Sequence, residues 1–304
     1  MKFIDLFCGI GGFRSVLEKF EHECIFSCDI DKFARKTYKE NYGDEPAGDI
    51  TKIKEQDIPT HDLLCAGFPC PAFSLAGKKK GFDDPRGKLF FEIIRIAKFH
   101  NPSILFLENV KNLVSHDKGK TFEIIKNELV QIGYNVNFKV LNAKNFGLPQ
   151  NRARVFLICL KNGGTYNFPN DLNIETKLSD ILEKNIEDKY TLSNNLWGSL
   201  QRIKEKHLAK GNGFGYCLFD EDAKYVSTIS ARYYKDGAEI LVKQNNKNPR
   251  RLTPREALNL QGYPDNFKIV CSDAQTYRQV GNSLSLNVIR EIVKELEIQN
   301  ILIN

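Results

Sequence analysis

The stretch Lys2-Phe3-Ile4-Asp5-Leu6-Phe7-Cys8-Gly9-Ile10-Gly11-Gly12-Phe13 passes from an apolar run through closely spaced glycines into a helix-like segment. This order predicts a strand, a tight loop and a helix, which is the placement that a nucleotide-cradling loop requires. Glycines allow the backbone to turn sharply and to approach a ligand closely. The dinucleotide fingerprint places its third glycine at position 14, where this chain has Arg14, so the loop fits a dehydrogenase poorly.

Strand-like and helix-like segments alternate along the first half of the chain. Short apolar runs predict strands at residues 2–7, 24–28, 62–66, 103–107, 136–141 and 154–160. Apolar residues at helical spacing predict helices at residues 12–20, 31–41, 87–100 and 121–132. The alternation implies an α/β fold with a doubly wound, mainly parallel sheet, whose ligand sites lie beyond the carboxyl ends of its strands.

The pattern loosens after Lys161. Residues 161–250 are rich in Asn, Lys, Gly and Asp and have shorter apolar runs, which predicts a second, smaller and more irregular domain. Order returns at Thr253, which is expected to cap a helix with Pro254 in its first turn and Glu256 three residues after the cap. We therefore expect a first domain at 1–160, a second domain at 161–250 and a return segment, 251–304, that completes the first.

The composition is that of an ordinary globular protein, with 304 residues, 41% of them hydrophobic and 27% charged. A carboxylate in the first apolar run argues against a signal peptide, and no stretch approaches the length of a membrane span. The eight cysteines contain no Cys-x-x-Cys pair, so we expect no metal site and a reducing cytoplasmic location. The net charge of +6 is compatible with a nucleic-acid partner.

Acidic residues stand at the ends of predicted strands. Asp29 lies 20 residues after Gly9, where a carboxylate can accept hydrogen bonds from both ribose hydroxyls. Asp49, after Gly48, is a second acidic group of this kind. With the glycine loop these residues predict an adenosine-type cofactor site, and the alternative is a tight turn of any α/β protein.

Cys70 follows another predicted strand, in the loop Gly67-Phe68-Pro69-Cys70-Pro71. Two prolines fix the direction of an exposed side chain, which favours a reactive thiolate, although a plain surface thiol is the alternative. Glu108 ends the next strand and is a natural general acid, with a helix cap as the alternative role. Arg152 and Arg154 share a face of an extended segment and could hold a carboxylate and a base or phosphate.

The order of these motifs resembles that of the cytosine-5 DNA methyltransferase family over essentially the whole chain. The shared motifs are Phe-x-Gly-x-Gly-Gly, Pro-Cys, Glu-Asn-Val, Gln-x-Arg-x-Arg, the Arg-x-x-x-Pro-Arg-Glu that ends at Glu256, and Gly281-Asn282-Ser283. The resemblance implies that S-adenosylmethionine gives a methyl group to carbon 5 of a cytosine in duplex DNA and leaves S-adenosylhomocysteine. Because a stacked base is inaccessible, the cytosine must be flipped out of the duplex.

The resemblance also implies residue roles. Cys70 would add to ring carbon 6, Glu108 would bind and protonate ring nitrogen 3, and Arg154 would support that carboxyl group, with Arg152 in the same catalytic set. The residues implied in S-adenosylmethionine binding are Phe7, Gly9, Gly11, Gly12, Asp29, Ile30, Asp49 and Asn282. Two positions depart from the family pattern: Asp29 replaces a usual glutamate, and Pro71 replaces a common glutamine, whose DNA contact is therefore in doubt.

DNA contacts are expected from two regions. Residues 71–88 resemble the family's loop that closes over DNA, which implies contacts from Ser74, Lys78, Lys79 and Lys80. Residues 161–250 correspond to the target-recognition region, and its stretches 210–216 and 227–237 resemble those of methylases that act on CC(A/T)GG or CCNGG; the first also resembles CCGG enzymes. The candidates there are Thr228, Arg232, Tyr233 and Lys235, with Arg232 suited to bidentate guanine recognition.

The expected target is the inner cytosine of a palindrome that begins CC and ends GG. The expected partners are double-stranded DNA and, in a restriction–modification system, an endonuclease that acts on the same site; we expect a monomer, associated with the bacterial nucleoid and not with a membrane. A tRNA cytosine-5 methyltransferase of the same fold is the alternative, and the DNA-methylase-like stretches argue against it. A catalytically silent DNA-binding relative and a thymidylate-synthase-like enzyme are less compatible with the full set of motifs.

Overall fold

The computed structural model describes residues 1–69, 85–161 and 163–302, and only the backbone of residues 85–88. The chain forms two compact units. Unit 1 comprises Met1–Leu141, Ala153–Asn170 and Val288–Asn304, and unit 2 comprises Asn142–Arg152 and Asp171–Asn287. Residues 142–152 and 251–287 thus lie in unit 2, while the functional domain limits expected from the sequence stay predictions.

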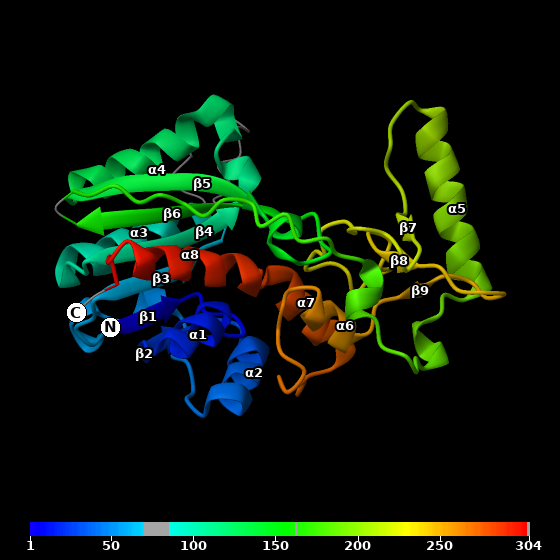
Figure 1. The fold of residues 1–304 in the computed structure, drawn as a ribbon, viewed down its shortest axis with the longest axis horizontal. Coiled ribbons are helices and arrows are strands. Elements are labelled where there is room, and N and C mark those ends of the chain that lie inside the picture. Colours follow the sequence, from blue (N-terminus) through cyan, green and yellow to red (C-terminus); the bar gives the residue numbers. More distant parts are fainter. Residues whose placement is uncertain (70–84, 162, 303–304) are drawn as a thin grey trace. The chain divides into compact units, whose positions relative to one another are not determined.

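Unit 1 is built on a six-stranded sheet (Figure 1). Its strands are β1 (Lys2–Leu6), β2 (Glu23–Cys28), β3 (Leu63–Gly67), β4 (Ile104–Val110), β5 (Tyr134–Asn142) and β6 (Ala153–Lys161), in the order β2-β1-β3-β4-β6-β5. β1 pairs in parallel with β2 and β3, and β3 pairs in parallel with β4, whereas β6 is antiparallel to β4. The mainly parallel sheet confirms the predicted fold class.

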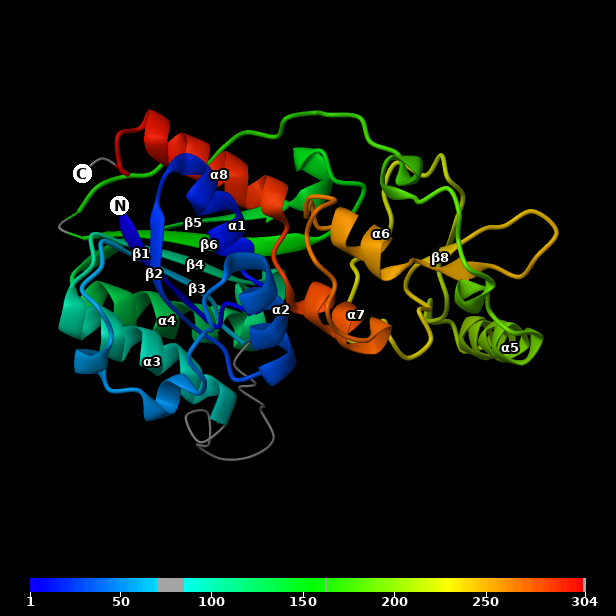
Figure 2. The ribbon, with the colours of Figure 1, turned by 90° about the horizontal axis from the view of Figure 1, so that it is seen from below.

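Helices cover both faces of this sheet. The α-helices are α1 (Gly12–Leu17), α2 (Lys32–Tyr42), α3 (Pro85–His100), α4 (Lys120–Gln131) and α8 (Leu286–Ile298), and the 3-10 helices are η1 (Glu18–Phe20), η2 (Ile50–Lys52), η3 (Glu55–Asp57), η4 (Lys111–Leu113) and η5 (His116–Gly119). Figure 2 shows α3 and α4 on one face and α1 and α8 on the other. This doubly wound arrangement leaves the strand ends as the place for a site.

The two faces follow from the alternation of side chains along each strand. Leu64 and Ala66 of β3 and Leu105 and Leu107 of β4 pack in one core with α3 and α4. On the opposite face, Phe106 packs against Phe13 of α1 with their ring centroids 4.9 Å apart. Because the strands of a parallel sheet are buried on both sides, their sequences read as nearly continuous apolar runs.

Asp5 is the buried charged residue of the apolar strand β1 and lies between Ile4 and Leu6, whereas Lys2 of this strand is exposed. Its burial raises the pKa of the Asp5 carboxyl well above the usual value, and the negative charge of Asp29 adds to this; the Arg14 guanidinium acts in the opposite direction. An acid with a raised pKa in the folded state contributes stability that is present at low pH and is lost as the pH rises through that folded pKa.

Asp5→Asn is therefore expected to stabilise the protein more at about pH 8 than at about pH 5, because asparagine has no charge to bury. Thermal unfolding followed by far-UV circular dichroism at both pH values measures the difference. Asp57→Asn is the matched control, since the same charge is removed from an exposed position of the same unit. A gain for Asp5→Asn that is equal at both pH values would contradict the expectation.

Unit 2 is less regular. Its helices are α5 (Asn194–Ala209), α6 (Pro254–Asn259), α7 (Asp273–Asn282), η6 (Ala143–Phe146), η7 (Leu178–Ile181) and η8 (Asp188–Tyr190). Its short strands β7 (Leu218–Phe219), β8 (Leu241–Val242) and β9 (Arg250–Arg251) form a three-stranded sheet in that order. The composition of residues 161–250 indicated few clear helices, yet α5 is a 16-residue helix. It buries only Leu200 fully, so its apolar periodicity is weak in the sequence.

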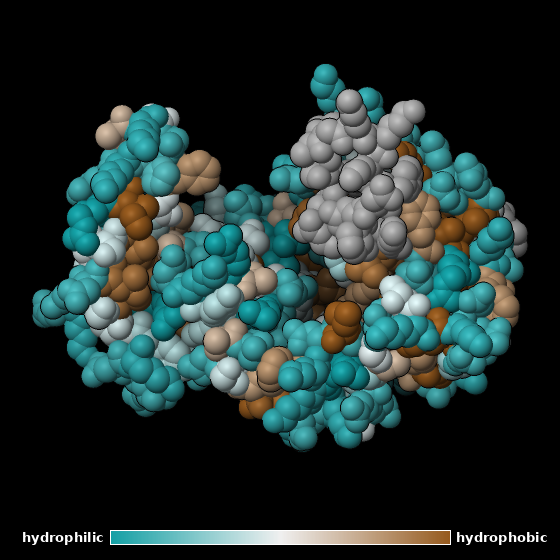
Figure 3. Space-filling model, turned by 180° about the vertical axis from the view of Figure 1, so that it is seen from behind, coloured by the Kyte–Doolittle hydropathy of each residue, from teal (hydrophilic) through white to brown (hydrophobic). Residues whose placement is uncertain are grey.

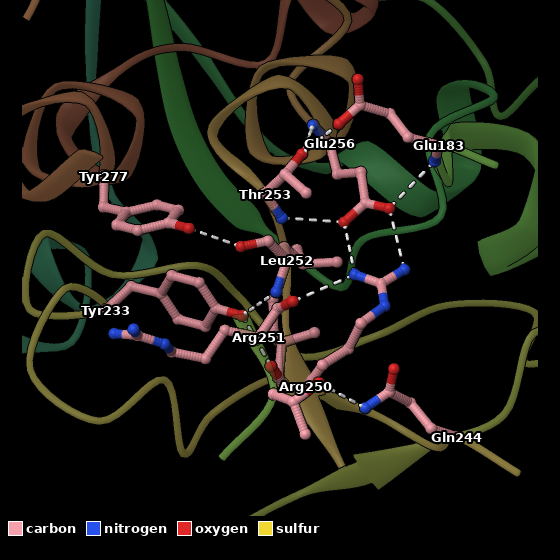
Figure 4. Close-up of polar contacts among 11 residues, drawn as sticks. Glu183, Tyr233, Gln244, Arg250, Arg251, Leu252, Thr253, Glu256 and Tyr277 are labelled. Carbon is pink, nitrogen blue, oxygen red and sulfur yellow. Dashed lines mark hydrogen bonds and ion pairs between the residues drawn. The ribbon is translucent and has the colours of Figure 1, made fainter. Parts of the chain in front are cut away.

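A buried polar network forms part of the interior of unit 2 (Figure 4). Arg250 and Glu256 form a bidentate ion pair, with nitrogen-to-oxygen distances of 2.7 and 2.9 Å. Glu256 also accepts hydrogen bonds from the backbone N–H groups of Thr253 and Glu183. Thr253 caps α6 by accepting from the Glu256 N–H, which confirms the predicted capping box. Both oxygens of the Glu256 carboxylate thus accept hydrogen bonds from groups inside the protein.

The surface of unit 2 exposes apolar side chains near α5. Figure 3 shows brown side chains among hydrophilic ones on the part that carries this helix, and Ile203, Leu208 and Phe214 are exposed there. In the described part of the chain, no helix has the length and apolar character needed to span a membrane. All seven cysteines in the described ranges are free thiols.

Candidate active site

The carboxyl ends of three neighbouring strands come together at one edge of the sheet in unit 1. Leu6 at the end of β1 pairs with Ala66 of β3, and Gly67 at the end of β3 pairs with Glu108 of β4. The glycine loop after β1, the segment that leads to Cys70 and the carboxyl group of Glu108 therefore start from adjacent strands. A parallel sheet places ligand-binding groups at this edge.

The glycine loop adopts backbone conformations that need glycine. Gly9 and Gly11 have φ angles of +55° and +80°, in the left-handed region. A Cβ at Gly11 would lie 2.4 Å from the Tyr42 ring, whose hydroxyl donates a hydrogen bond to the Gly11 carbonyl at 2.9 Å. Gly12 then begins α1, and Phe7 precedes the loop with a φ of +56°. The backbone conformation of the loop is thus fixed by packing against Tyr42 as well as by its glycines.

Asp29 binds the loop directly. One oxygen of its carboxylate accepts a hydrogen bond from the Gly9 N–H at 2.8 Å, and the other accepts from the Asp31 N–H at 2.7 Å. Burial raises the pKa of Asp29, and these two hydrogen bonds oppose that rise. The next residue, Ile30, is 74% exposed, which is unusual for a large apolar side chain at a strand end. A partly buried carboxylate beside an exposed apolar side chain fits a ribose and an aromatic base.

Asp49 lies at the start of η2. Its carboxylate accepts hydrogen bonds from the Thr51 N–H at 3.1 Å and from the Thr51 hydroxyl at 2.7 Å. These bonds lower the pKa of Asp49, so it is ionised at neutral pH. Asp49 is a helix cap in this structure, and its contact with a cofactor stays a prediction.

Arg14 is a supporting residue that the sequence did not single out for a role. Its guanidinium forms ion pairs with Glu18 at 2.6 Å and Asp44 at 2.7 Å, and lies 5.0 Å from the centre of the Tyr42 ring. Arg14 thereby connects α1 to the tyrosine that packs on Gly11. Its place at the position where a dinucleotide fingerprint has glycine was the available signal.

Glu108 and Arg154 form the charged pair of the site. The antiparallel pairing of β4 with β6 places Arg154 opposite Val110, and its Nε lies 3.2 Å from Oε1 of Glu108. The two side chains are 16% and 10% exposed. Burial lowers the pKa of Arg154, and the carboxylate of Glu108 opposes that effect. The supporting arginine that the sequence predicted is therefore in contact with the predicted acid.

Asn109 has a second role that the sequence did not reveal. Its Nδ2 donates a hydrogen bond to the Phe68 carbonyl at 2.8 Å, and its Oδ1 accepts from the Val110 N–H. Phe68 is two residues before Cys70. Asn109 thus fixes the end of β4 to the segment that enters the cysteine loop.

Several predicted residues lie outside the described part of the chain. They are Cys70, Ser74, Lys78, Lys79 and Lys80, together with Pro71. Their roles stay predictions from the sequence.

The thiols near the sheet in unit 1 are poor nucleophiles. Burial raises the pKa of Cys24 and of Cys28 to about 12. Burial also raises the pKa values of Cys8 and Cys65 well above the usual range. A thiol is nucleophilic as the thiolate, so these four cysteines are protonated and unreactive at neutral pH.

Arg152 and Arg154 have different partners. Arg152 ends the first segment of unit 2, and its guanidinium donates hydrogen bonds to the carbonyls of Ile229, Gly281 and Ser283. Arg154 belongs to unit 1 and contacts Glu108. We expected the two arginines to share one face of the segment. In the structure they lie in two separate environments, each with its own partners. Asn282 is exposed at the end of α7 in unit 2, and its cofactor contact stays a prediction.

The predicted DNA-contacting residues of unit 2 differ in exposure. Arg232 and Lys235 are exposed, whereas the Thr228 hydroxyl donates to the Asn151 carbonyl at 2.6 Å. Tyr233 needs a correction: its side chain is completely buried, and its hydroxyl donates to the Ile240 carbonyl and accepts from the Leu252 N–H. A ring packed in the interior cannot contact DNA, so Tyr233 is a core residue. Residues 1–69, 85–161 and 163–302 contain no group of three or more His, Cys, Asp or Glu side chains that could hold a metal ion.

Comparison with known proteins gives a family match over nearly the whole chain. The family model described as C-5 cytosine-specific DNA methylase matches residues 1–298. The chain is 52% identical over 301 residues to the type II methyltransferase M1.ScrFI of Lactococcus lactis subsp. cremoris, which covers 97% of this chain and 77% of that protein. It is 51% identical over 300 residues to the type II methyltransferase M.NlaX of Neisseria lactamica, which covers 97% of this chain and 96% of that protein.

Solved structures share the fold at lower identity. The methyltransferase EhMeth of Entamoeba histolytica has a TM-score of 0.83 at 23% identity, covering 99% of this chain and 98% of that one. The Dnmt2 methyltransferase of S. pombe has a TM-score of 0.82 at 19% identity, covering 100% of both chains. These structures show that the whole chain has the methyltransferase fold.

Proposed function

Because the chain belongs to the C-5 cytosine-specific DNA methylase family and is a DNA cytosine-5 methyltransferase of the type II restriction–modification kind, we propose that it flips a cytosine out of duplex DNA and attacks it through Cys70. The observation that carries this proposal is the contact between Glu108 and Arg154 at the strand edge from which the Cys70 loop starts. Such a pair places an acid where the attacked base must receive a proton.

The residues divide the work as follows. The thiolate of Cys70 forms a bond to carbon 6 of the cytosine, while Glu108 donates a proton to ring nitrogen 3, which makes carbon 6 electrophilic enough for the attack. Arg154 orients the carboxyl group through its contact with Oε1 and holds it beside the base. Asn109 keeps the Phe68 carbonyl, and with it the start of the cysteine loop, in place. After the transfer a base removes the proton from carbon 5 and Cys70 leaves.

S-adenosylmethionine would supply the methyl group. The residues of unit 1 fit an adenosine compound: Asp29 is partly buried with its carboxylate beside the glycine loop, and the exposed side chain of Ile30 follows it. We propose that Asp29 accepts hydrogen bonds from the ribose and that Ile30 covers the base. The backbone of Gly9 can approach the ligand closely, because no side chain of its own and no neighbouring atom fills the space beside it.

We propose as the target the inner cytosine of a palindrome that begins CC and ends GG. The support is the resemblance of residues 210–216 and 227–237 to stretches of methylases that act on such sites, together with the exposure of Arg232 and Lys235. A restriction endonuclease that cuts the same site is the partner implied by a type II system. The family match names DNA and not tRNA, so the tRNA alternative is not favoured.

Methyl transfer from labelled S-adenosylmethionine, with duplex DNA and tRNA offered separately, tests the proposal. We expect label in the DNA alone, bisulfite sequencing that places 5-methylcytosine at the inner position of CC…GG sites, and complete loss of transfer in Cys70→Ala. Cys65→Ala is the matched control, since that thiol is buried in the sheet and is expected to be dispensable for transfer. Undiminished transfer by Cys70→Ala would overturn the mechanism.

A further inference from the structure

Two separate segments of unit 2 meet at the side chain of Arg152. The guanidinium, which is almost completely buried, donates to the Ile229 carbonyl at 3.1 Å through Nη1. Through Nη2 it donates to the carbonyls of Gly281 and Ser283 at 3.1 and 2.6 Å. Its partners are thus backbone oxygens on both sides of Asn282 and one residue after Thr228.

Gln150 makes the neighbouring connection. Its Oε1 accepts from the Ile229 N–H at 3.1 Å, and its Nε2 donates to the Leu260 carbonyl at 3.0 Å. Gln261 continues the chain of contacts by donating to the Val280 carbonyl at 3.1 Å. Both the N–H and the C=O of Ile229 are therefore held by side chains from the Gln-x-Arg motif, and connected hydrogen bonds in a buried site rigidify the segments that they join.

The two segments held by Arg152 also touch each other. A Cβ at Gly281 would lie 2.3 Å from the backbone of Ser230 and of Ala231, so helix α7 packs directly on this stretch. Thr228 is fixed at the other end by its hydrogen bond to the Asn151 carbonyl. Asn282 itself is exposed between the buried residues Gly281 and Ser283. The backbone is clamped while the side chain of Asn282 stays open to a ligand.

We propose that Arg152 is a positioning residue that holds the Asn282 segment and the Thr228–Ala231 segment in one arrangement, so that one buried guanidinium supports both cofactor binding and DNA binding. The proposal rests on the proposed function, because it takes Asn282 as a cofactor contact and the stretch that includes Arg232 as a DNA contact. The role proposed for Arg152 differs from that of Arg154, which contacts Glu108, the proposed acid of the reaction. Lysine cannot replace Arg152, because one ammonium group cannot span three carbonyls.

The test compares binding of two ligands in single and double variants. S-adenosylhomocysteine and a short duplex with a CC…GG site are titrated separately by calorimetry. We expect Asn282→Ala to weaken only the nucleoside ligand and Arg232→Ala to weaken only the duplex. Arg152→Lys is expected to raise both dissociation constants about tenfold, as the loss of charge-assisted hydrogen bonds implies. In the Asn282→Ala background, Arg152→Lys should change the nucleoside constant by less than about twofold.

Arg250→Lys is the matched control, because Arg250 is an equally buried arginine of unit 2 that pairs with Glu256 and contacts neither segment. It should lower the unfolding temperature and leave both dissociation constants within about twofold. If Arg152→Lys does not fold, Arg152→Gln, which buries no charge and keeps one amide donor, is expected to show the same two effects.

Three results would each overturn the inference. The first is unchanged dissociation constants in folded Arg152→Lys, and the second is a tenfold change of the nucleoside dissociation constant by Arg152→Lys in the Asn282→Ala background. The third is the same increase of both dissociation constants in Arg250→Lys. Methyl transfer by the unaltered protein keeps this result apart from the proposed function. A protein that methylates DNA while its Arg152 variants bind both ligands normally overturns the inference alone, whereas a protein that transfers no methyl group overturns the proposed function.

Discussion

Replacement of Glu108 by glutamine is expected to lower the rate of methyl transfer by about 10²–10⁴-fold, the contribution of a positioned general acid. Glutamine has the size of glutamate and can still meet Arg154, but it has no carboxylic proton to give to ring nitrogen 3. Without that proton carbon 6 is a poor electrophile for the thiolate. Single-turnover methyl transfer measures the effect, and binding of the duplex should change by less than about threefold, because Glu108 acts in the transition state.

Glu92→Gln is the matched control for this experiment. Glu92 is also a glutamate paired with an arginine in unit 1, since its Oε2 lies 2.7 Å from Nη2 of Arg95. It lies on α3, away from the strand edge, so its loss should leave the rate of transfer unchanged. Transfer at the full rate by Glu108→Gln would show that another group protonates the base.

Glu256→Gln is expected to destabilise unit 2 by about 3–5 kcal/mol, the usual result of removing one partner of a buried ion pair. Glu256 is completely buried, and each of its oxygens accepts both an Arg250 N–H and a backbone N–H (Figure 4). A glutamine would place an NH₂ group against two donors and would leave the charge of Arg250 buried without compensation. Both effects act in the same direction.

The fluorescence of Trp197 reports this change, because it is the only tryptophan of the chain and lies in α5 of unit 2. Urea unfolding followed at Trp197 should shift strongly for Glu256→Gln and hardly at all for Lys243→Gln, which removes a partner of an exposed pair in the same unit. Replacing both Arg250 and Glu256 by apolar residues of similar size should recover most of the loss. An unchanged transition in Glu256→Gln would mean that the pair is not buried in solution.

The sheet of unit 1 could be predicted because its strands are buried on both faces. Apolar runs marked β1, β2, β3 and β4 to within a few residues, and glycine or capping residues marked where α1 and α2 begin. Asp31, expected as the first residue of a helix, is in fact the cap of α2, which is the usual uncertainty at helix ends. The helix α5 was missed because it buries only Leu200 fully, so its apolar pattern is weak. The helix α7 was missed because the residues that it buries include Thr276, Gln279 and Gly281, which do not mark an apolar face in the sequence.

The candidate site was predictable where a residue stands at a strand end, as Asp29 and Glu108 do, because position along the strand also fixes position in space. The direction in which a side chain points was harder to predict from the sequence. Tyr233 belongs to an aromatic cluster whose sequence resembles a surface hairpin, yet contacts far along the chain bury it. Arg152 and Arg154 are separated by one residue and have different partners, since the former bonds to backbone oxygens contributed by residues 229, 281 and 283.

Unit 2 consists of the long insertion 171–287 together with the short segment 142–152. A graft designed to transplant sequence specificity between related enzymes would naturally exchange only the insertion. The glutamine and arginine of the recipient enzyme at positions 150 and 152 would then have to form hydrogen bonds with backbone carbonyl groups of a foreign insertion. The part that must be transferred therefore has two segments. Chimeras that carry residues 142–152 together with the insertion should fold and methylate the new target sequence. Chimeras that carry the insertion alone should neither fold properly nor methylate the new target sequence.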